Sequence, residues 1–227
     1  MNGLLQDAGS YSAPNNCATR LLSETLGRVK NPPPVLVMAS AVGFYGNRGD
    51  EILDEDSQPG QGFFPALCQA WEQASHPAEQ AGIRVVHLRF GMVLSPDGGA
   101  LARLAPMFKL GLGGNLGSGR QWMSWVTEMD AIRSVLFVLE HRSLSGAVNA
   151  TSPKPVINAD FTRELGHAVH RPTLFPAPAF ALRLAFGQMA DEALLSSTRA
   201  VPQRLLDAGF TFEHPTIQTA FATALEK

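Results

Sequence analysis

The 227-residue sequence has few cysteines, little charge and no long apolar run. Its two cysteines, Cys17 and Cys68, are too few for a disulfide framework and fit a reducing compartment. The net charge is −2 with no block of like charge, which argues against nucleic acid or an anionic membrane as a partner. No apolar stretch reaches the roughly 18 residues that span a bilayer, and residues 1–14 lack the pattern of a signal peptide. We therefore expect a cytoplasmic protein.

Metal and thiol chemistry also find little support in the sequence. The histidines at positions 76, 167, 170 and 214 lack cysteine or carboxylate partners at metal-ligand spacing, so we expect no metal site. Cys68 lies on one face of a predicted helix and is predicted to be a packing residue. His87, between Val86 and Leu88, is predicted to be a core or cleft histidine.

What the chain does have is an ordinary globular composition, with 45% hydrophobic residues, and an alternation of strand and helix patterns. Strands are predicted at residues 35–39 and 83–94, and helices at residues 63–82 and 127–140, with Thr127 as N-cap. This alternation favours an α/β fold with a parallel sheet. Beyond Pro172 the pattern is helical only, over residues 178–190, 196–208 and 215–225, which predicts a small helical C-terminal lobe.

Residues 36–46 (LVMASAVGFYG) are the most informative stretch. An apolar strand ends there in small residues and a hydroxyl, and delivers Ser40 and Tyr45 to the carboxyl end of the sheet, where open α/β folds bind ligands. Ser40 could polarise a carbonyl or hydroxyl group, or simply close a turn. Tyr45 could donate a proton if a nearby cation lowered its pKa, or it could be structural.

Two further polar stretches leave alternatives open. Residues 111–119 contain five glycines, but they follow a predicted helix, so a mobile loop beside a substrate cleft is favoured over a phosphate cradle. Arg120 could hold an anionic group or be a solvated surface side chain. The acidic loop of Glu51, Asp54, Glu55 and Asp56 is interpreted as solvated.

The order of these motifs resembles the extended (atypical) short-chain dehydrogenase/reductases of the NAD-dependent epimerase/dehydratase superfamily. The closer resemblance is to a bacterial epimerase-like family with a C-terminal helical domain of unknown function (the DUF1731 type). It rests on residues 35–46, on the acidic loop at 54–57, on LRFGMVLSP at 88–96, on WMSWVTEMD at 122–130 and on the helical segments between 179 and 210. It covers about residues 16–226.

This resemblance implies a Rossmann-type sheet and a set of site residues. It implies NADP or NAD as cofactor and a small-molecule substrate, a nucleotide sugar or another small carbonyl or hydroxyl compound. Ser40 and Tyr45 would be catalytic, and Arg120 and Trp122 would line the substrate side. The cofactor-binding residues would be Ala39, Ser40, Arg89, Gly91 and Val93.

The sequence departs from the family pattern in two places. The Tyr-x-x-x-Lys pair of the superfamily is replaced, counting back from Glu72, by Phe64 and Cys68, which supply neither a phenolic proton nor an ammonium group. The family's opening strand, Gly-x-x-Gly-x-x-Gly turn and helix, with two further βα units, do not precede Asn15. We therefore expect an N-terminally truncated chain with three parts. These are an unrelated or disordered leader (1–14), the second half of a Rossmann-like epimerase domain (15–172) and a helical C-terminal domain (173–227).

Truncation would remove the helix N-terminus that holds a pyrophosphate and would expose an apolar sheet edge. Such a chain should be marginally stable or need a partner, and self-association through the edge is one way to cover it. We expect an NAD(P)-dependent epimerase or reductase-like protein with impaired cofactor binding. The alternatives are a non-catalytic interaction protein, since relatives are labelled cell-division inhibitors, and a non-functional fragment.

Overall fold

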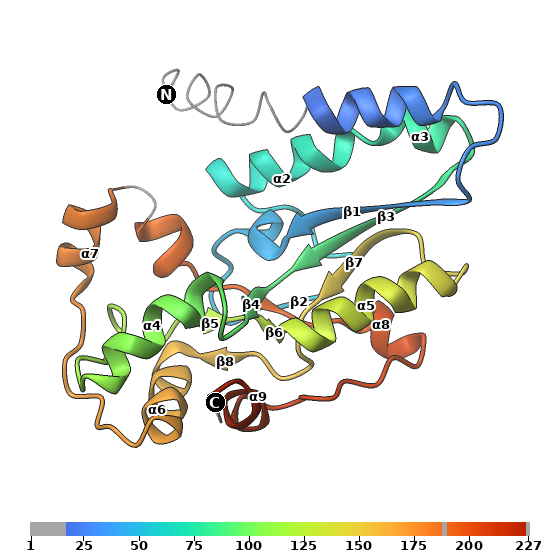
Figure 1. The fold of residues 1–227 in the computed structure, drawn as a ribbon. Coiled ribbons are helices and arrows are strands. Elements are labelled where there is room, and N and C mark those ends of the chain that lie inside the picture. Colours follow the sequence, from blue (N-terminus) through green and yellow to red (C-terminus); the bar gives the residue numbers. More distant parts are fainter. Residues whose placement is uncertain (1–16, 188–189, 226–227) are drawn as a thin grey trace.

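The computed structural model describes residues 17–187 and 190–225. At its centre, three parallel strands lie side by side in the order β1 (Val35–Ala41), β3 (Arg84–Phe90) and β7 (Gly146–Ala150) (Figure 1). Runs such as VLVMASA and RVVHLRF form these strands because a sheet covered on both faces needs apolar side chains in both directions. The predicted α/β class and parallel sheet are confirmed.

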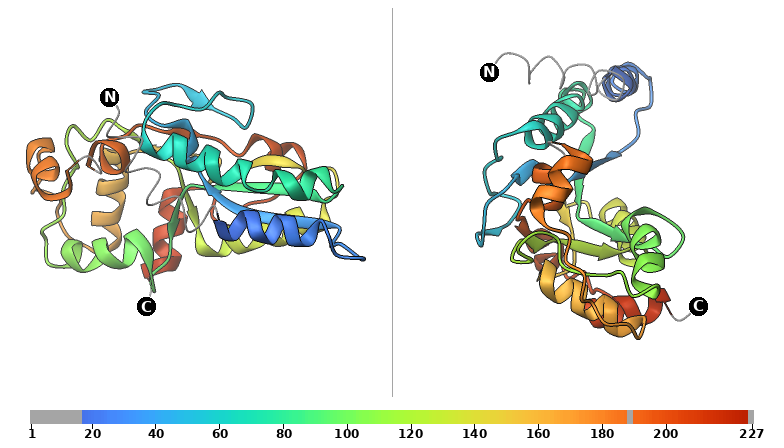
Figure 2. Two further views of the ribbon diagram at one scale, coloured as in Figure 1. Left: turned by 90° about the horizontal axis from the view of Figure 1, so that it is seen from above. Right: turned by 90° about the vertical axis from the view of Figure 1, so that its left-hand side faces the viewer.

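Helices cover both faces of this sheet (Figures 1 and 2). Leu36 and Met38 of β1 pack in the core under one group of helices, whereas Val35 and Val37 pack in the core on the opposite face. The first group comprises a helix over residues 17–26, α2 (Phe63–Gln73) and α3 (His76–Gln80); the opposite face is covered by α5 (Glu128–Glu140). As predicted, Thr127 caps α5, since its side chain accepts a hydrogen bond from Asp130 N.

A second core lies beyond the carboxyl ends of the central strands (Figure 1). Trp125, Phe161 and Phe221 are buried at its centre, and the two phenylalanine rings meet edge to face at 5.1 Å between centroids. The paired strands beside it are β4 (Met92–Leu94) with β6 (Trp125–Thr127), and β5 (Trp122–Met123) with β8 (Val156–Ile157). The helices around it are α4 (Gly99–Lys109), α6 (Asn158–Ala168) and α9 (Ile217–Leu225).

The C-terminal region is helical, as predicted, but it also contributes a strand. Its elements are α7 (Ala179–Phe186), the π-helical turn η2 (Ala190–Leu194), β9 (Arg199–Ala200) and α8 (Gln203–Asp207). β9 pairs in parallel with β2 (Ile52–Leu53), and Val201 N donates a hydrogen bond to Leu53 O. The predicted helix at 196–208 is therefore wrong over its first half, because this backbone is held extended by a distant segment.

Two predicted elements are each divided in the structure. The helix at 63–82 is α2 and α3, separated at Ser75, whose buried hydroxyl donates to Glu72 O and lies 2.7 Å from His87 Nε2. This contact places His87 in the core, as predicted. The strand at 83–94 is β3 and β4, separated at Gly91, where a Cβ atom would lie 2.7 Å from Ser124 O. The predicted leader, residues 1–14, lies outside the described residues.

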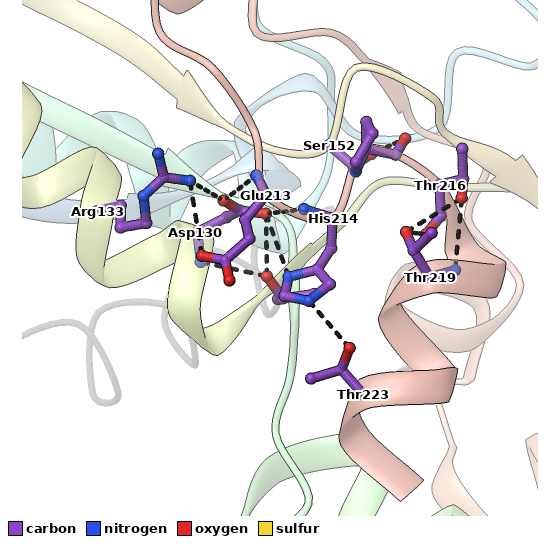
Figure 3. A network of polar contacts seen from close by, with 10 residues as sticks. Asp130, Arg133, Ser152, Glu213, His214, Thr216, Thr219 and Thr223 are labelled. Carbon is purple, nitrogen blue, oxygen red and sulfur yellow. Dashed lines mark hydrogen bonds and ion pairs between the residues drawn. The ribbon is translucent and has the colours of Figure 1, made fainter. Parts of the chain in front are cut away.

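Asp130 joins the C-terminal segment to the sheet domain (Figure 3). This carboxylate, 1% exposed, accepts hydrogen bonds from Glu213 N at 2.8 Å and His214 N at 3.0 Å, and pairs with Arg133 at 2.9 Å. The His214 ring continues the chain of contacts to Thr223 Oγ1 of α9 at 3.1 Å. A buried carboxylate with this many donors is stabilised only while they remain in place.

We predict that Asp130→Ala lowers the free energy of unfolding by about 3 kcal/mol, because two backbone N–H groups and Arg133 lose their acceptor. Urea denaturation followed by circular dichroism measures the change. The matched control is Asp160→Ala, whose ion pair with Arg163 is exposed, and which should cost less than about 1 kcal/mol. Equal costs for the two variants would contradict the role assigned to Asp130.

Candidate active site at the carboxyl ends of the central strands

Three polar residues lie in one row across the central sheet. Ser40 of β1 is in register with Arg89 of β3, and Arg89 is in register with Asn149 of β7. All three lie next to the carboxyl end of their strand, the edge at which open α/β sheets bind ligands. Because alternate residues share a face, the row puts all three side chains on the α2 side of the sheet.

Glu72 of α2 reaches down to this row and forms a buried ion pair with Arg89. Arg89 Nε and Nη2 donate to the two carboxylate oxygens at 2.8 Å each, a bidentate geometry, and Ser40 Oγ donates to the same carboxylate at 2.8 Å. The guanidinium carbon also lies 3.4 Å from the centre of the Phe44 ring. Burial alone would raise the pKa of Glu72, but Arg89 outweighs it and holds this pKa below its usual value.

Tyr45 lies at the end of the 3₁₀ helix η1 (Val42–Tyr45) and is fully buried. Its hydroxyl accepts a hydrogen bond from Arg89 Nη1 at 3.0 Å and donates one to Asn149 Oδ1 at 2.8 Å. Burial raises the pKa of Tyr45, and the nearby Arg89 offsets this only in part. Ser40, Tyr45 and Arg89, all predicted site residues, thus meet in one polar network.

Glu55 is a member of this network that the sequence interpretation misses. The acidic loop is interpreted as solvated, but the Glu55 carboxylate is buried and accepts hydrogen bonds from Asn149 N at 3.0 Å and Arg204 N at 3.3 Å. Burial raises the pKa of Glu55. The solvated interpretation is wrong for this one residue, because the loop turns back on the Asp54–Ser57 hydrogen bond and directs Glu55 inward.

The other predicted cofactor contacts, Ala39, Gly91 and Val93, are small or apolar residues near the ends of β1 and β3, and we refer to them together as the strip. Ala39 is exposed on the face of β1 opposite to Ser40, and Val93 is half-buried in β4. Gly91, between β3 and β4, is required by close packing, since a Cβ there would also lie 3.0 Å from Thr151 Cγ2. Ala39 is exposed, Gly91 and Val93 are half-buried, and none of the three carries a charge.

Helix α2 carries the two positions at which the superfamily pair is replaced. A Cβ atom on Gly43 would lie 3.3 Å from Phe64 Cβ, so Phe64 packs directly against η1. Cys68 is buried, which confirms its predicted packing role, and burial raises the pKa of its thiol to about 11. Glu192 of η2 accepts hydrogen bonds from the N–H groups of Phe63 and Phe64, at 3.0 and 3.2 Å, and so caps α2 from the C-terminal region.

The predicted substrate residues are not part of the network. Trp122 Nε1 donates to Asp50 Oδ1 at 2.8 Å, and the Arg199 guanidinium lies 4.0 Å from the centre of its ring. Arg120 is exposed at the end of the glycine-rich loop. Their assignment to the substrate side stays a prediction.

Three kinds of functional feature do not occur in the described ranges, 17–187 and 190–225: a metal cluster, a membrane-spanning helix and a dinucleotide-binding glycine turn. No three His, Cys, Asp or Glu side chains there gather closely enough to hold a metal ion. Within the same ranges, every helix is too short or too polar to cross a bilayer. Glycines spaced three apart occur at 43–49 and 111–117, but in this part of the chain no such turn leads from a strand into an α-helix.

The pKa of Glu72 is lowered and that of Glu55 is raised, so we predict that the two side chains affect the stability of the fold in opposite ways as the pH falls. Ionised Glu72 stabilises the fold above its unfolded-state pKa, and this contribution is lost as the pH falls through its lower folded-state pKa. The pKa of Glu55 is raised, so its contribution to stability depends on pH in the opposite way. This contribution is largest in acid and is lost as the pH rises through the folded-state pKa. Glu72→Gln should therefore cost about 3 kcal/mol at pH 7, and this cost should fall only once the pH drops below the unfolded-state pKa of a glutamate. Glu55→Gln, measured by the same urea titrations, should become more costly as the pH falls from 7 to that unfolded-state pKa, and a cost that falls with pH for both variants would contradict the network.

Comparisons with known proteins agree with this architecture. A family model described as "Domain of unknown function (DUF1731)" matches residues 177–224. The chain is 51% identical over 189 residues to the "Epimerase family protein Mb2239" of Mycobacterium bovis, covering 83% of this chain and 63% of that protein. It is 34% identical over 217 residues to the "Epimerase family protein SA0724" of Staphylococcus aureus, covering 92% of this chain and 70% of the relative.

A solved structure shows the same fold at higher coverage. The crystal structure of human epimerase family protein SDR39U1 (isoform 2) with NADPH superposes with a TM-score of 0.90 at 28% identity, covering 97% of this chain and 75% of the human one. The present chain matches 63% of the mycobacterial relative, which is less than two thirds of the length of that protein. It belongs to the epimerase family, the NAD-dependent epimerase-like proteins with a C-terminal DUF1731 region.

Proposed function

We propose that this chain forms the nicotinamide and substrate half of an NAD(P)-linked epimerase or reductase-like enzyme. Its substrate would be a nucleotide sugar or another small carbonyl or hydroxyl compound. One observation carries the proposal: Glu72 fixes the Ser40–Arg89–Asn149 row at the carboxyl ends of three parallel strands, the edge at which open α/β sheets bind ligands. The human neighbour was crystallised with NADPH, which supports the cofactor class.

The residues present fit one half of such a cofactor. Ala39, Gly91 and Val93 offer small and apolar groups against which a flat nicotinamide ring can lie, and a bound nicotinamide supplies hydride transfer. They do not fit the other half, since the described residues hold no strand, glycine turn and helix N-terminus that could bind a diphosphate. The same residues suit NADP and NAD equally, because the two cofactors differ only at the 2′ position of the adenosine ribose and carry the same nicotinamide ring.

Ser40 and Tyr45 stay predicted catalytic residues, and their contacts favour a positioning role. The Ser40 hydroxyl donates a hydrogen bond to Glu72. The Tyr45 hydroxyl donates a hydrogen bond to Asn149 and accepts one from Arg89. Both protons are thus engaged within the protein, and the raised pKa of Tyr45 opposes proton release at neutral pH. On the substrate side, the exposed Arg120 would meet an anionic group, and Trp122 would offer an apolar ring.

Cys68 cannot replace the superfamily lysine as a cation, because a thiol is either neutral or anionic, and this one, with a pKa of about 11, is neutral at pH 7. We predict that a disulfide reagent at pH 8 reacts quickly with exposed Cys17 alone, and with Cys68 only after unfolding in denaturant. The absorbance of the released thiolate counts the reacting groups. Cys17→Ala is the control, and rapid reaction of that variant in its folded state would contradict the assignment.

The cofactor proposal predicts weak binding that depends on the nicotinamide end. Titrations of NADPH and of reduced nicotinamide mononucleotide, followed by nicotinamide fluorescence, should both give dissociation constants of about 1 mM. Ala39→Ile, a strand-compatible change at an exposed position, should weaken both at least about tenfold by filling the strip. Leu110→Ala, at the exposed end of α4, is the control and should change neither.

Two outcomes would count against this proposal. Micromolar binding of NADPH that is much tighter than binding of the mononucleotide would show that the chain holds the diphosphate. Absence of binding by either ligand would favour the non-catalytic alternative, in which the chain acts by association with another protein.

A further inference from the structure

A groove of about 470 Å³ opens between three helices, α4, α6 and α9, and we call it the α4–α6–α9 groove. Helix α6 contacts both of the others, and the three lie together in the lower part of the right-hand view of Figure 2. Its volume falls within the range of small-molecule sites, about 300–1,000 Å³. No residue of the Ser40–Arg89–Asn149 row or of the strip lines it. Most of its lining is apolar, namely Ala168, Val169, Phe221, Ala222 and Leu225.

The floor of this groove belongs to the second core. The Phe221 side chain is 1% exposed and is fixed by its edge-to-face contact with the Phe161 ring. Val169 and Leu225 are half-buried and pack against the same core. A ligand with an apolar body would therefore lie against rigid groups, and the protein would lose little conformational entropy on binding it.

The polar side chains of the groove are Lys109 and His170. One guanidinium bonds to the backbone of both, since Arg171 Nε donates to Lys109 O at 3.1 Å and Arg171 Nη1 donates to His170 O at 3.1 Å. Arg171 thereby complements the carbonyl ends of α4 and α6. Lys109 and His170 take no part in the ion pairs found among the described residues, and no acidic side chain of that part of the chain lines the groove.

His170 stands at a position that favours glycine. Its φ of 55° is left-handed, and within residues 17–187 and 190–225 no other non-glycine residue has a positive φ. The turn is a Schellman motif, in which His170 N donates to His167 O at 3.1 Å and Arg171 N donates to Gly166 O at 2.9 Å. Glycine is the usual residue at this point because a side chain costs free energy there. What the histidine adds is an imidazole, with at least one N–H donor, on the lining of the groove.

We propose that the α4–α6–α9 groove binds a small amphipathic anion, a carboxylate attached to an apolar chain or ring. The Lys109 ammonium and the His170 N–H meet the carboxylate, and the floor around Phe221 covers the apolar part. Cationic groups without an acidic neighbour on the lining favour an anion. The apolar floor favours an organic anion over an inorganic one, which has no apolar surface to bury. This site is independent of the cofactor proposal.

Titration with octanoate tests this assignment, with the full 227-residue chain and NMR spectra of its backbone amides. Octanoate joins a carboxylate to an apolar chain, whereas octanol lacks the charge and acetate lacks the chain. We expect saturable shifts at residues 168–171 and along α9, with a dissociation constant of about 1 mM or lower. Octanol and acetate at the same concentrations should shift these signals less than about a tenth as much. Octanol that binds as tightly as octanoate, or octanoate shifts confined to other residues, would overturn the proposal.

Three substitutions separate the charge, the imidazole and the apolar floor. Lys109→Gln should weaken octanoate binding about tenfold, because a charged donor to the carboxylate is lost. Ala222→Trp, at an exposed lining position, should abolish binding by filling the groove. His170→Gly removes the imidazole but suits the left-handed turn, so it should weaken binding at least about threefold without lowering Tm. The matched control is Arg103→Gln, which removes an exposed cation of α4 outside the lining and should leave the affinity unchanged.

The His170→Gly variant separates binding from structure, since a residue that only ends α6 would leave the affinity for octanoate unchanged. An unchanged affinity in either His170→Gly or Lys109→Gln would overturn the proposal. So would an equal loss of affinity in Lys109→Gln and Arg103→Gln, because the effect would then be one of net charge. None of these measurements uses NADPH, so their outcome is independent of the cofactor titrations.

Discussion

The buried ion pair of Glu72 and Arg89 is the contact on which the carboxyl edge of the sheet depends. It links α2 to β3 directly, to β1 through Ser40, and to β7 through Tyr45 and Asn149. A buried pair of charges contributes little net free energy compared with apolar packing, but it tolerates few geometries. Its main effect here is therefore specificity: the strand ends and η1 are held in one arrangement, next to the strip that we assign to a nicotinamide ring.

The C-terminal region is fastened to this edge through backbone groups as well as by packing. Glu192 caps the first turn of α2, Glu55 accepts from Arg204 N, and Asp130 accepts from Glu213 N and His214 N. In each contact a carboxylate satisfies N–H groups that otherwise lack a partner, so each contact has a strong orientation. The DUF1731 region is thereby tied to the helix that carries Phe64 and Cys68, and a displacement of η2 would free the start of that helix.

The sequence patterns are sufficient for the sheet but not for the network. Apolar runs identify β1 and β3, and Thr127 identifies the start of α5, because these signals are local. The alignment of Ser40 with Arg89 and Asn149 depends on the register between strands that are far apart in the sequence. A local sequence pattern does not determine this register. The burial of Glu55 and the extended backbone of β9 escape prediction for the same reason, since the partners of both lie far away along the chain. Gly91 shows the intermediate case, in which a single glycine inside an apolar run marks a close approach to another strand.

The two halves of the proposed cofactor site place different demands on the protein. Binding a nicotinamide ring needs an uncharged surface with fixed strand ends, and the Glu72–Arg89 pair fixes the strand ends locally. Binding a diphosphate needs several backbone N–H groups aimed at one point, which requires a strand and a helix joined by a tight glycine turn. The residues that we assign to the first demand also stabilise the sheet, whereas residues 17–187 and 190–225 contain no unit of the second kind.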